Sequence, residues 1–274
     1  MAIGDRDTGA GSGTRSLREV PLQPGGVSLI DGLISTRAIR RYTDEPVPDL
    51  VLRDILFAAT RAPSGSNRQP FRFLVLTDSP AAAVAKRLIG EAAQRVWAAK
   101  RERDGYTEGS AARPDSPKSR MARTMEQYVD AFASVPVLIL PCLNRYREPE
   151  YSEGANVYPA CQNLLLAARA YGYGGVLTMF HREVEPQLRT MLAVPEGTVM
   201  SATITLGRPA GPPGPVRRRP LRELEYQDAW GEPAPWAVDP PDTSFTAAGP
   251  PRPVAAAGPG PAAGGVPPGT ERCG

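Results

Sequence analysis

Between residues 28 and 229, segments with the apolar spacing of helices alternate with short apolar runs typical of strands. The helical spacing is clearest over residues 81–103, where apolar side chains recur every three to four positions. The runs at 72–77 and 135–140 stand next to Pro, Gly or polar residues and predict buried strands. This alternation restricts the chain to a layered α/β or α+β fold.

Both ends of the chain differ from this central part. Residues 1–27 are mostly Gly, Ser, Thr and charged residues, and residues 231–274 are crowded with Pro, Gly and Ala. Such segments have too little apolar surface to offset the entropy lost on ordering. We therefore predict two disordered tails around one domain at 28–230, which is long enough to bury a core.

The charge balance and the cysteines exclude several classes of function. The chain has 32 Lys+Arg and 29 Asp+Glu, a net charge of +3, whereas a nucleic-acid binder would have a larger basic excess. The 3 cysteines are widely separated and show no metal-binding spacing, so we expect no metal site and a reducing, cytoplasmic setting. No apolar run suits a membrane span or a secretory leader, so we expect no membrane partner.

The joint between a predicted helix ending near Thr60 and the strand at 72–77 is unusually polar. Its sequence, Ala-Pro-Ser-Gly-Ser-Asn-Arg-Gln-Pro-Phe, occupies residues 62–71. The prolines stiffen the loop, and the short side chains and glycine would let a flat polar ring approach its backbone. An ordinary proline turn would also explain this sequence.

Arginines are concentrated just after a predicted short helix that Ser28 could cap. Arg37, Arg40 and Arg41 fall within five residues, and the first two could converge on one anion if the turn stays helical. These residues therefore form a candidate phosphate clamp. A solvated charged surface is the alternative interpretation.

The segment 152–171 is helical in pattern and apolar nearly all round, which predicts a central helix or one at a subunit interface. Pro159 should kink this helix or mark its true start. A Gly-rich turn and a short strand at 176–179 follow.

Several reaction types lack their sequence signatures. The chain has no GxGxxG after its first strand, no GxxxxGK[ST] and no GxSxG. Its only histidine, His181, is expected either at the surface or behind the site, where it would support ligand-contacting residues, and not as a metal ligand. Cys142 and Cys161 lie in apolar runs, which predicts buried, inert thiols and argues against a Cys–His nucleophile.

Five motifs together resemble the FMN-dependent nitroreductase-like family. They are Thr-Arg-Ala-Ile-Arg-Arg-Tyr-Thr-Asp-Glu-Pro-Val at 36–47, the polar loop at 62–73, Gln-Asn-Leu-Leu-Leu-Ala-Ala at 162–168, Gly-Arg-Pro at 207–209, and Arg-Arg-Pro-Leu at 218–221. They occur in the family's order and span about residues 28–226. Each motif is weak alone, and together they are specific.

The resemblance implies an α+β three-layer fold, with a central, mostly antiparallel sheet flanked by helices. It also implies an intertwined homodimer with two FMN sites at the interface, each lined by both subunits. The helix within 155–170 would form much of the dimer contact.

The resemblance also assigns cofactor-binding residues by position. Arg37, Ala38 and Arg40, with Arg218 or Arg219, would hold the FMN phosphate. The other residues implied to surround the flavin are Pro63, Ser64, Gly65, Asn67, Gln69, Leu177, Thr178 and Met179. Many family members have a basic residue and a serine where this chain has Thr36 and Ala38, so phosphate binding depends more on the remaining arginines.

The implied reaction is ping-pong hydride transfer, in which NAD(P)H reduces the flavin and a small electron-poor acceptor reoxidises it. Nitroaromatics and quinones are the expected acceptors. The cofactor supplies the chemistry, so no catalytic side chain is named. A flavin-fragmenting, dehalogenating or azoline-oxidising enzyme is an alternative, as is an FMN-binding protein without enzymatic activity.

Overall fold

The computed structural model describes residues 26–212, 214 and 216–245. These residues form two compact units, one ending at Val216 and one starting at Arg217. The helices are α1 (Leu29–Ser35), α2 (Asp49–Ala59), α3 (Pro80–Arg103), α4 (Pro117–Asp130), α5 (Tyr158–Ala170) and α6 (Glu185–Met191). The strands are β1 (Phe71–Leu76), β2 (Val137–Asn144), β3 (Gly174–Thr178), β4 (Thr198–Met200) and β5 (Thr203–Gly207).

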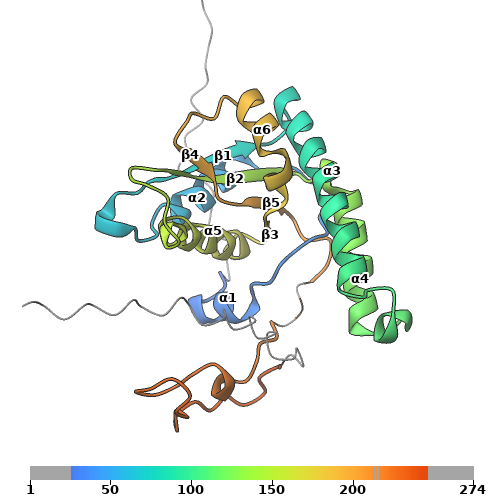
Figure 1. Ribbon diagram of the computed structural model, residues 1–274, viewed down its shortest axis with the longest axis vertical. Helices are drawn as coiled ribbons and strands as arrows, with labels where there is room; N and C mark the ends of the chain where they lie inside the picture. The colour runs from blue at the N-terminus through green and yellow to red at the C-terminus, as the bar shows by residue number, and fades with distance from the viewer. Residues whose placement is uncertain (1–25, 213, 215, 246–274) are drawn as a thin grey trace, which may run out of the picture. The chain divides into compact units, whose positions relative to one another are not determined.

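The five strands form one sheet in the order β1-β2-β5-β3, and β4 pairs with β2 (Figure 1). All four pairings are antiparallel. β2 lies at the centre, with β1 along one edge and β4 and β5 sharing the other edge. This position accounts for the burial of every residue of β2 except Asn144.

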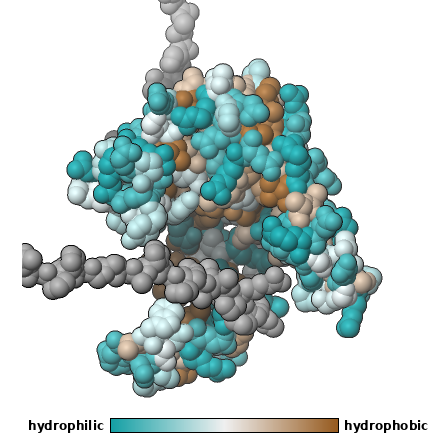
Figure 2. All heavy atoms as spheres, in the orientation of Figure 1, coloured by the Kyte–Doolittle hydropathy of each residue, from teal (hydrophilic) through white to brown (hydrophobic). Residues whose placement is uncertain are grey.

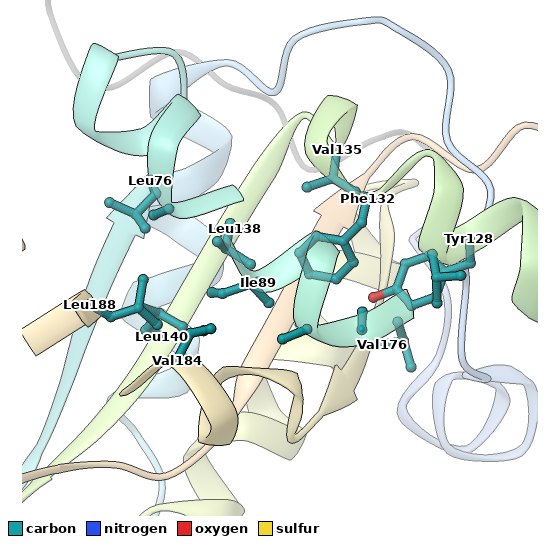
Figure 3. Close-up of a cluster of buried hydrophobic side chains, with 14 of the residues drawn as sticks. Leu76, Ile89, Tyr128, Phe132, Val135, Leu138, Leu140, Val176, Val184 and Leu188 are labelled. Atoms are coloured by element: carbon teal, nitrogen blue, oxygen red, sulfur yellow. The ribbon is translucent and has the colours of Figure 1, made fainter. Parts of the chain in front are cut away.

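Two hydrophobic clusters lie on opposite faces of the sheet, as the alternation of side chains along a strand requires. Leu138 and Leu140 of β2 belong to the cluster that includes residues of α3, α4 and α6, and Figure 3 shows these side chains pointing toward one another. Val137 and Ile139 belong to the other cluster, with residues of α2 and α5. The expected three-layer α+β fold is therefore confirmed.

Capping residues set the starts of several helices. The Oγ atoms of Ser28, Ser79 and Ser116 each accept a hydrogen bond from the backbone N–H three residues later. Prolines follow directly at the first positions of α3 and α4. The exposed faces of α3 and α4 are mostly hydrophilic in the view of Figure 2, as expected for amphipathic helices.

The structure decides between the two roles expected of Pro159 and corrects the extent of one strand. Pro159 lies in the first turn of α5, so it marks the start of the helix and produces no kink. Residues 199–206 alternate in the sequence as one strand would, but Ser201 and Ala202 divide them into β4 and β5. The division occurs because the chain pairs with both ends of β2, and Ser201 N–H donates to Pro141 O between them at 2.8 Å.

The second unit contains residues 217–245 of the described chain. Leu221 N–H donates to the Asp239 carboxylate at 3.1 and 3.2 Å, and Trp236 Nε1–H donates to Gln227 Oε1 at 3.2 Å. These contacts involve residues on both sides of the predicted domain end at 230. Of the predicted tails at 1–27 and 231–274, residues 1–25 and 246–274 lie outside the described residues. No helix among the described residues is long and apolar enough to cross a membrane.

Candidate functional site

The arginine-bearing segment 36–43 is extended and is held at the edge of the sheet. Ile39 N–H donates to Gly175 O at 3.0 Å, and Thr43 N–H donates to Arg208 O at 2.9 Å. The helix ends at Ser35, and Thr36 is already extended. The helical turn considered for Arg37 and Arg40 is therefore absent, because pairing with neighbouring backbone replaces it.

Tyr42 anchors this segment to the sheet. Its Oη donates to Ile39 O at 2.6 Å and lies 2.8 Å from Thr205 Oγ1. Tyr128 Oη lies 2.9 Å from the same threonine hydroxyl. Burial raises the pKa of both Tyr42 and Tyr128, so both phenols stay neutral and act as hydrogen-bonding supports.

Two adjoining cavities, named here the arginine cavities, open beside the segment. Arg37, Arg40 and Arg41 line the smaller one, of about 170 Å³. Arg37, Arg169 and Arg208 line the larger one, of about 280 Å³. Among the described residues, no Asp or Glu lines either cavity. A cluster of guanidinium groups without carboxylates favours a bound anion, and arginine suits phosphate in particular.

Buried polar atoms at the arginine cavities lack partners within the described chain. Arg40 Nε and Thr36 Oγ1 are both buried without a hydrogen bond. Burial also lowers the pKa of Arg40, although a guanidinium stays protonated in proteins. Such groups are costly to leave unsatisfied. A phosphate would supply the charge and the acceptor atoms that Arg40 needs, so these residues fit such a group.

Arg208 differs from the other arginines because it has partners. Its Nε lies 2.5 Å from Glu45 Oε2, and its guanidinium stacks over the Tyr173 ring at 4.8 Å. The hydrogen bond to Glu45 raises the pKa of Arg208. Arg208 therefore contributes shape and donors to the larger cavity but little uncompensated charge.

The polar loop predicted to contact the flavin is strained and mostly exposed. Ser66, Asn67 and Gln69 have φ values of 50°, 51° and 49°, a region that residues other than glycine seldom adopt. Ser64 Oγ accepts from Gln69 N–H at 2.8 Å, and Gly65 N–H donates to Asn156 Oδ1 at 2.9 Å. Backbone strain held by specific hydrogen bonds is frequent at ligand sites.

The third predicted group lies at the end of β3. Leu177 and Thr178 are half-buried, and Met179 is exposed. Met179 lines a further cavity of about 370 Å³, which His181 and Tyr158 also line.

His181 is buried, so of its two expected positions, at the surface or behind the site, the surface position is wrong. Its Nε2 lies 2.9 Å from Met200 O and must donate to it, while Nδ1 lies 2.9 Å from Thr203 Oγ1. Burial lowers the pKa of His181, so the ring is a neutral support for β4 and β5. The buried, inert thiols are confirmed, because desolvation raises the pKa of Cys142 to about 11 and of Cys161 to about 12.

The first unit thus holds the predicted site residues in three places: the arginine segment, the polar loop and the end of β3. Arg37, Ala38 and Arg40 share the smaller arginine cavity, which is lined by no residue of the loop at 62–71 or of 177–179. β3 connects two of the places, because Gly174 lines the larger arginine cavity and Met179 lines the further one. At a rise of about 3.3 Å per residue, these positions are about 17 Å apart, which suits an elongated ligand.

Arg218 and Arg219 belong to the second unit. Arg219 pairs with Glu223 at 2.7 Å, and Arg218 is exposed. Their predicted role at a phosphate stays a prediction.

The nitroreductase family model matches residues 33–208, which include the arginine segment, the polar loop, β3 and the whole sheet. The chain belongs to the nitroreductase family. The match ends at Arg208 and so does not include Arg218 and Arg219.

Individual relatives agree with this assignment. A NADH dehydrogenase of Thermus thermophilus is 31% identical over 209 residues, covering 70% of this chain and 91% of the relative. A nitrobenzene nitroreductase of Ectopseudomonas oleovorans is 28% identical, with 65% and 86% covered. A solved structure from Desulfovibrio desulfuricans, in complex with FMN, has a TM-score of 0.53 at 28% identity and covers 77% of this chain and 99% of that one.

The sequence alone assigned no role to Arg169 or Arg208, which also line the larger arginine cavity. Arg208 was visible inside the Gly-Arg-Pro motif. Arg169 was visible as a cation in the last turn of an otherwise apolar helix. No metal-binding cluster of His, Cys, Asp and Glu occurs within the described ranges.

Proposed function

We propose that this nitroreductase-family protein is an FMN-dependent oxidoreductase that passes hydride from NAD(P)H to an electron-poor acceptor such as a nitroaromatic or a quinone. The observation that carries the proposal is the pair of carboxylate-free arginine cavities, with buried Arg40 Nε unpaired beside them. When bound, FMN supplies the redox chemistry, and the protein supplies position and electrostatics.

In this proposal, Arg37 and Arg40 hold the phosphate of FMN, and Ala38 lies beside it. Leu177, Thr178 and Met179 lie along the flavin, because β3 extends from the larger arginine cavity toward Met179. The relatives named for NADH and nitrobenzene support the classes of reductant and acceptor.

The polar loop at 62–71 does not line the arginine cavities of its own chain. We assign its contact with the flavin to the site of a second subunit, so that a homodimer completes each site. The partly exposed apolar side chains of α1 and α5 suit such an interface, and they include Leu29 at 72% and Ile34 at 63% exposure. The loop itself lies against Asn156, just before α5.

Turnover assays test the reaction. The full-length protein is expected to oxidise NADPH or NADH in the presence of nitrobenzene or a benzoquinone, with double-reciprocal plots that stay parallel as the acceptor is varied. Flavin binding without turnover of any acceptor would instead favour a non-enzymatic FMN-binding protein. Halide release from halogenated phenols would favour the dehalogenating alternative.

Gly214 is expected to position Arg37. A Cβ atom at residue 214 would lie 2.7 Å from Arg37 Nη1, which is too close. Because the end of a flexible side chain can move, Gly214→Ala should change the free energy of unfolding by less than about 1 kcal/mol. It should nevertheless weaken FMN binding several-fold, measured by quenching of flavin fluorescence.

A double-mutant cycle isolates this effect. In an Arg37→Gln background, Gly214→Ala should add little further loss of affinity, because the crowded guanidinium is already gone. Equal losses in both backgrounds would show that Gly214 acts independently of Arg37.

A further inference from the structure

Arg169 occupies an unexplained position in the larger arginine cavity. It lies in the last turn of α5, and its Nε is 3.4 Å from Ser35 Oγ, at the end of α1. No ion pair among the described residues includes Arg169 or Arg37, whereas Arg208 is paired with Glu45. Two uncompensated guanidinium groups therefore line one cavity that has no acidic side chain.

The lining of this cavity also includes small and polar residues. Gly174 and Gly175 line it with backbone alone, and Thr36 contributes a buried hydroxyl that has no partner among the described residues. The two arginine cavities also share Arg37 and Pro209, so they adjoin. Arg37 therefore lies between the cavity that Arg40 lines and the cavity that Arg169 lines.

From this juxtaposition we propose that Arg169 is a further phosphate-binding residue, which acts with Arg37 on the phosphate of the bound FMN. The proposal rests on the proposed function. Arg169 would hold the phosphate from α5, and Arg40 from the segment that follows α1. Arg169 would also provide a charge that Thr36 does not. Ser35 orients the guanidinium through its hydroxyl.

A structural role is the competing explanation for Arg169. A cation in the last turn of a helix interacts favourably with the helix dipole, whether or not a ligand is present. The two explanations differ in their dependence on the phosphate. A phosphate ligand affects FMN binding but not the binding of riboflavin, which has the same ring and ribityl chain without the phosphate.

The test is the dissociation constants of FMN and riboflavin for the full-length protein, followed by flavin fluorescence. Arg169→Gln is expected to raise the dissociation constant of FMN by about tenfold or more and that of riboflavin by less than about twofold. Arg169→Lys should recover part of the loss, since it keeps the charge without the planar fork. Arg87→Gln, on an exposed part of α3, is the matched control and should change neither constant.

An unchanged FMN constant in Arg169→Gln would overturn the proposal, even if thermal stability fell. Equal losses for FMN and riboflavin would overturn it as well, because they would indicate a general distortion. If Arg169→Gln does not fold, the same comparison is made with Arg169→Lys. A larger loss of affinity for FMN than for riboflavin would then support the proposal. Equal losses, or no loss, would overturn it. Failure of the wild-type protein to bind FMN would instead reject the proposed function.

Discussion

The double substitution Arg37→Gln/Arg40→Gln is expected to weaken FMN binding by about two orders of magnitude or more. Each guanidinium can make charge-assisted hydrogen bonds to a phosphate, and such bonds contribute about 1.5–3 kcal/mol each. Loss of two therefore removes at least about 3 kcal/mol, and 1.4 kcal/mol corresponds to a tenfold change in the dissociation constant. Fluorescence titration with FMN measures the effect.

The fold should tolerate this double substitution. Neither arginine makes an ion pair within the described chain, and the segment is held by backbone bonds and by Tyr42. The matched control is Arg87→Gln/Arg95→Gln on α3, which removes the same charge from exposed surface pairs worth little. An equal loss of FMN affinity in the control would mean that net charge, and not the arginine cavities, governs binding.

Gly175→Ala is expected to have the largest effect on stability. A Cβ atom at residue 175 would overlap the Thr205 carbonyl oxygen on the neighbouring strand and lie 3.1 Å from Leu165 Cδ2. The first of these atoms is backbone in the middle of the sheet, so β3 and β5 would have to separate. We expect a loss of about 3 kcal/mol in the free energy of unfolding, at the upper end for overpacked cores, measured by denaturant titration.

Gly175→Ala should also weaken FMN binding at the candidate site. Gly175 O accepts the hydrogen bond from Ile39 N–H that holds the arginine segment to β3. FMN affinity should therefore fall together with stability. Gly32→Ala provides a comparison at another buried glycine, where the methyl group would meet its nearest atom at 3.8 Å and gain helix propensity. A similar loss of stability there would show that added volume, and not the backbone overlap, is responsible.

Local sequence signals predicted most of the first unit. The apolar spacing over 81–103 placed α3, and the apolar runs at 72–77 and 135–140 placed β1 and the first half of β2. These features depend on neighbours within a few residues, so one sequence contains enough information to find them.

Features that depend on distant contacts were not predictable in this way. The division between β4 and β5 follows from how they share the edge of β2, and the burial of His181 follows from its bonds to Met200 and Thr203. Arg169 enters the candidate site because α5 ends beside Ser35, 134 residues earlier in the chain. No periodicity or spacing in the sequence encodes such proximity.

In the candidate site, too, features set by local sequence were predictable and features set by distant contacts were not. The arginine motif and the polar loop were recognisable because their composition is unusual for their positions between elements. Their separation within one chain was not visible in the sequence, and neither were the positive φ angles of Ser66, Asn67 and Gln69. The loop is bonded to Asn156, 91 residues later than Gly65, and local sequence does not encode such a contact.

The most direct test of the central claim is the visible absorption spectrum of the purified full-length protein, recorded before and after anaerobic addition of NADPH or NADH. We predict a flavin spectrum that bleaches with at least one reductant, and release of FMN, identified by mass, when the protein is denatured. A protein that shows no flavin absorption even after incubation with excess FMN would contradict the account, because the arginine cavities would then serve a different anion.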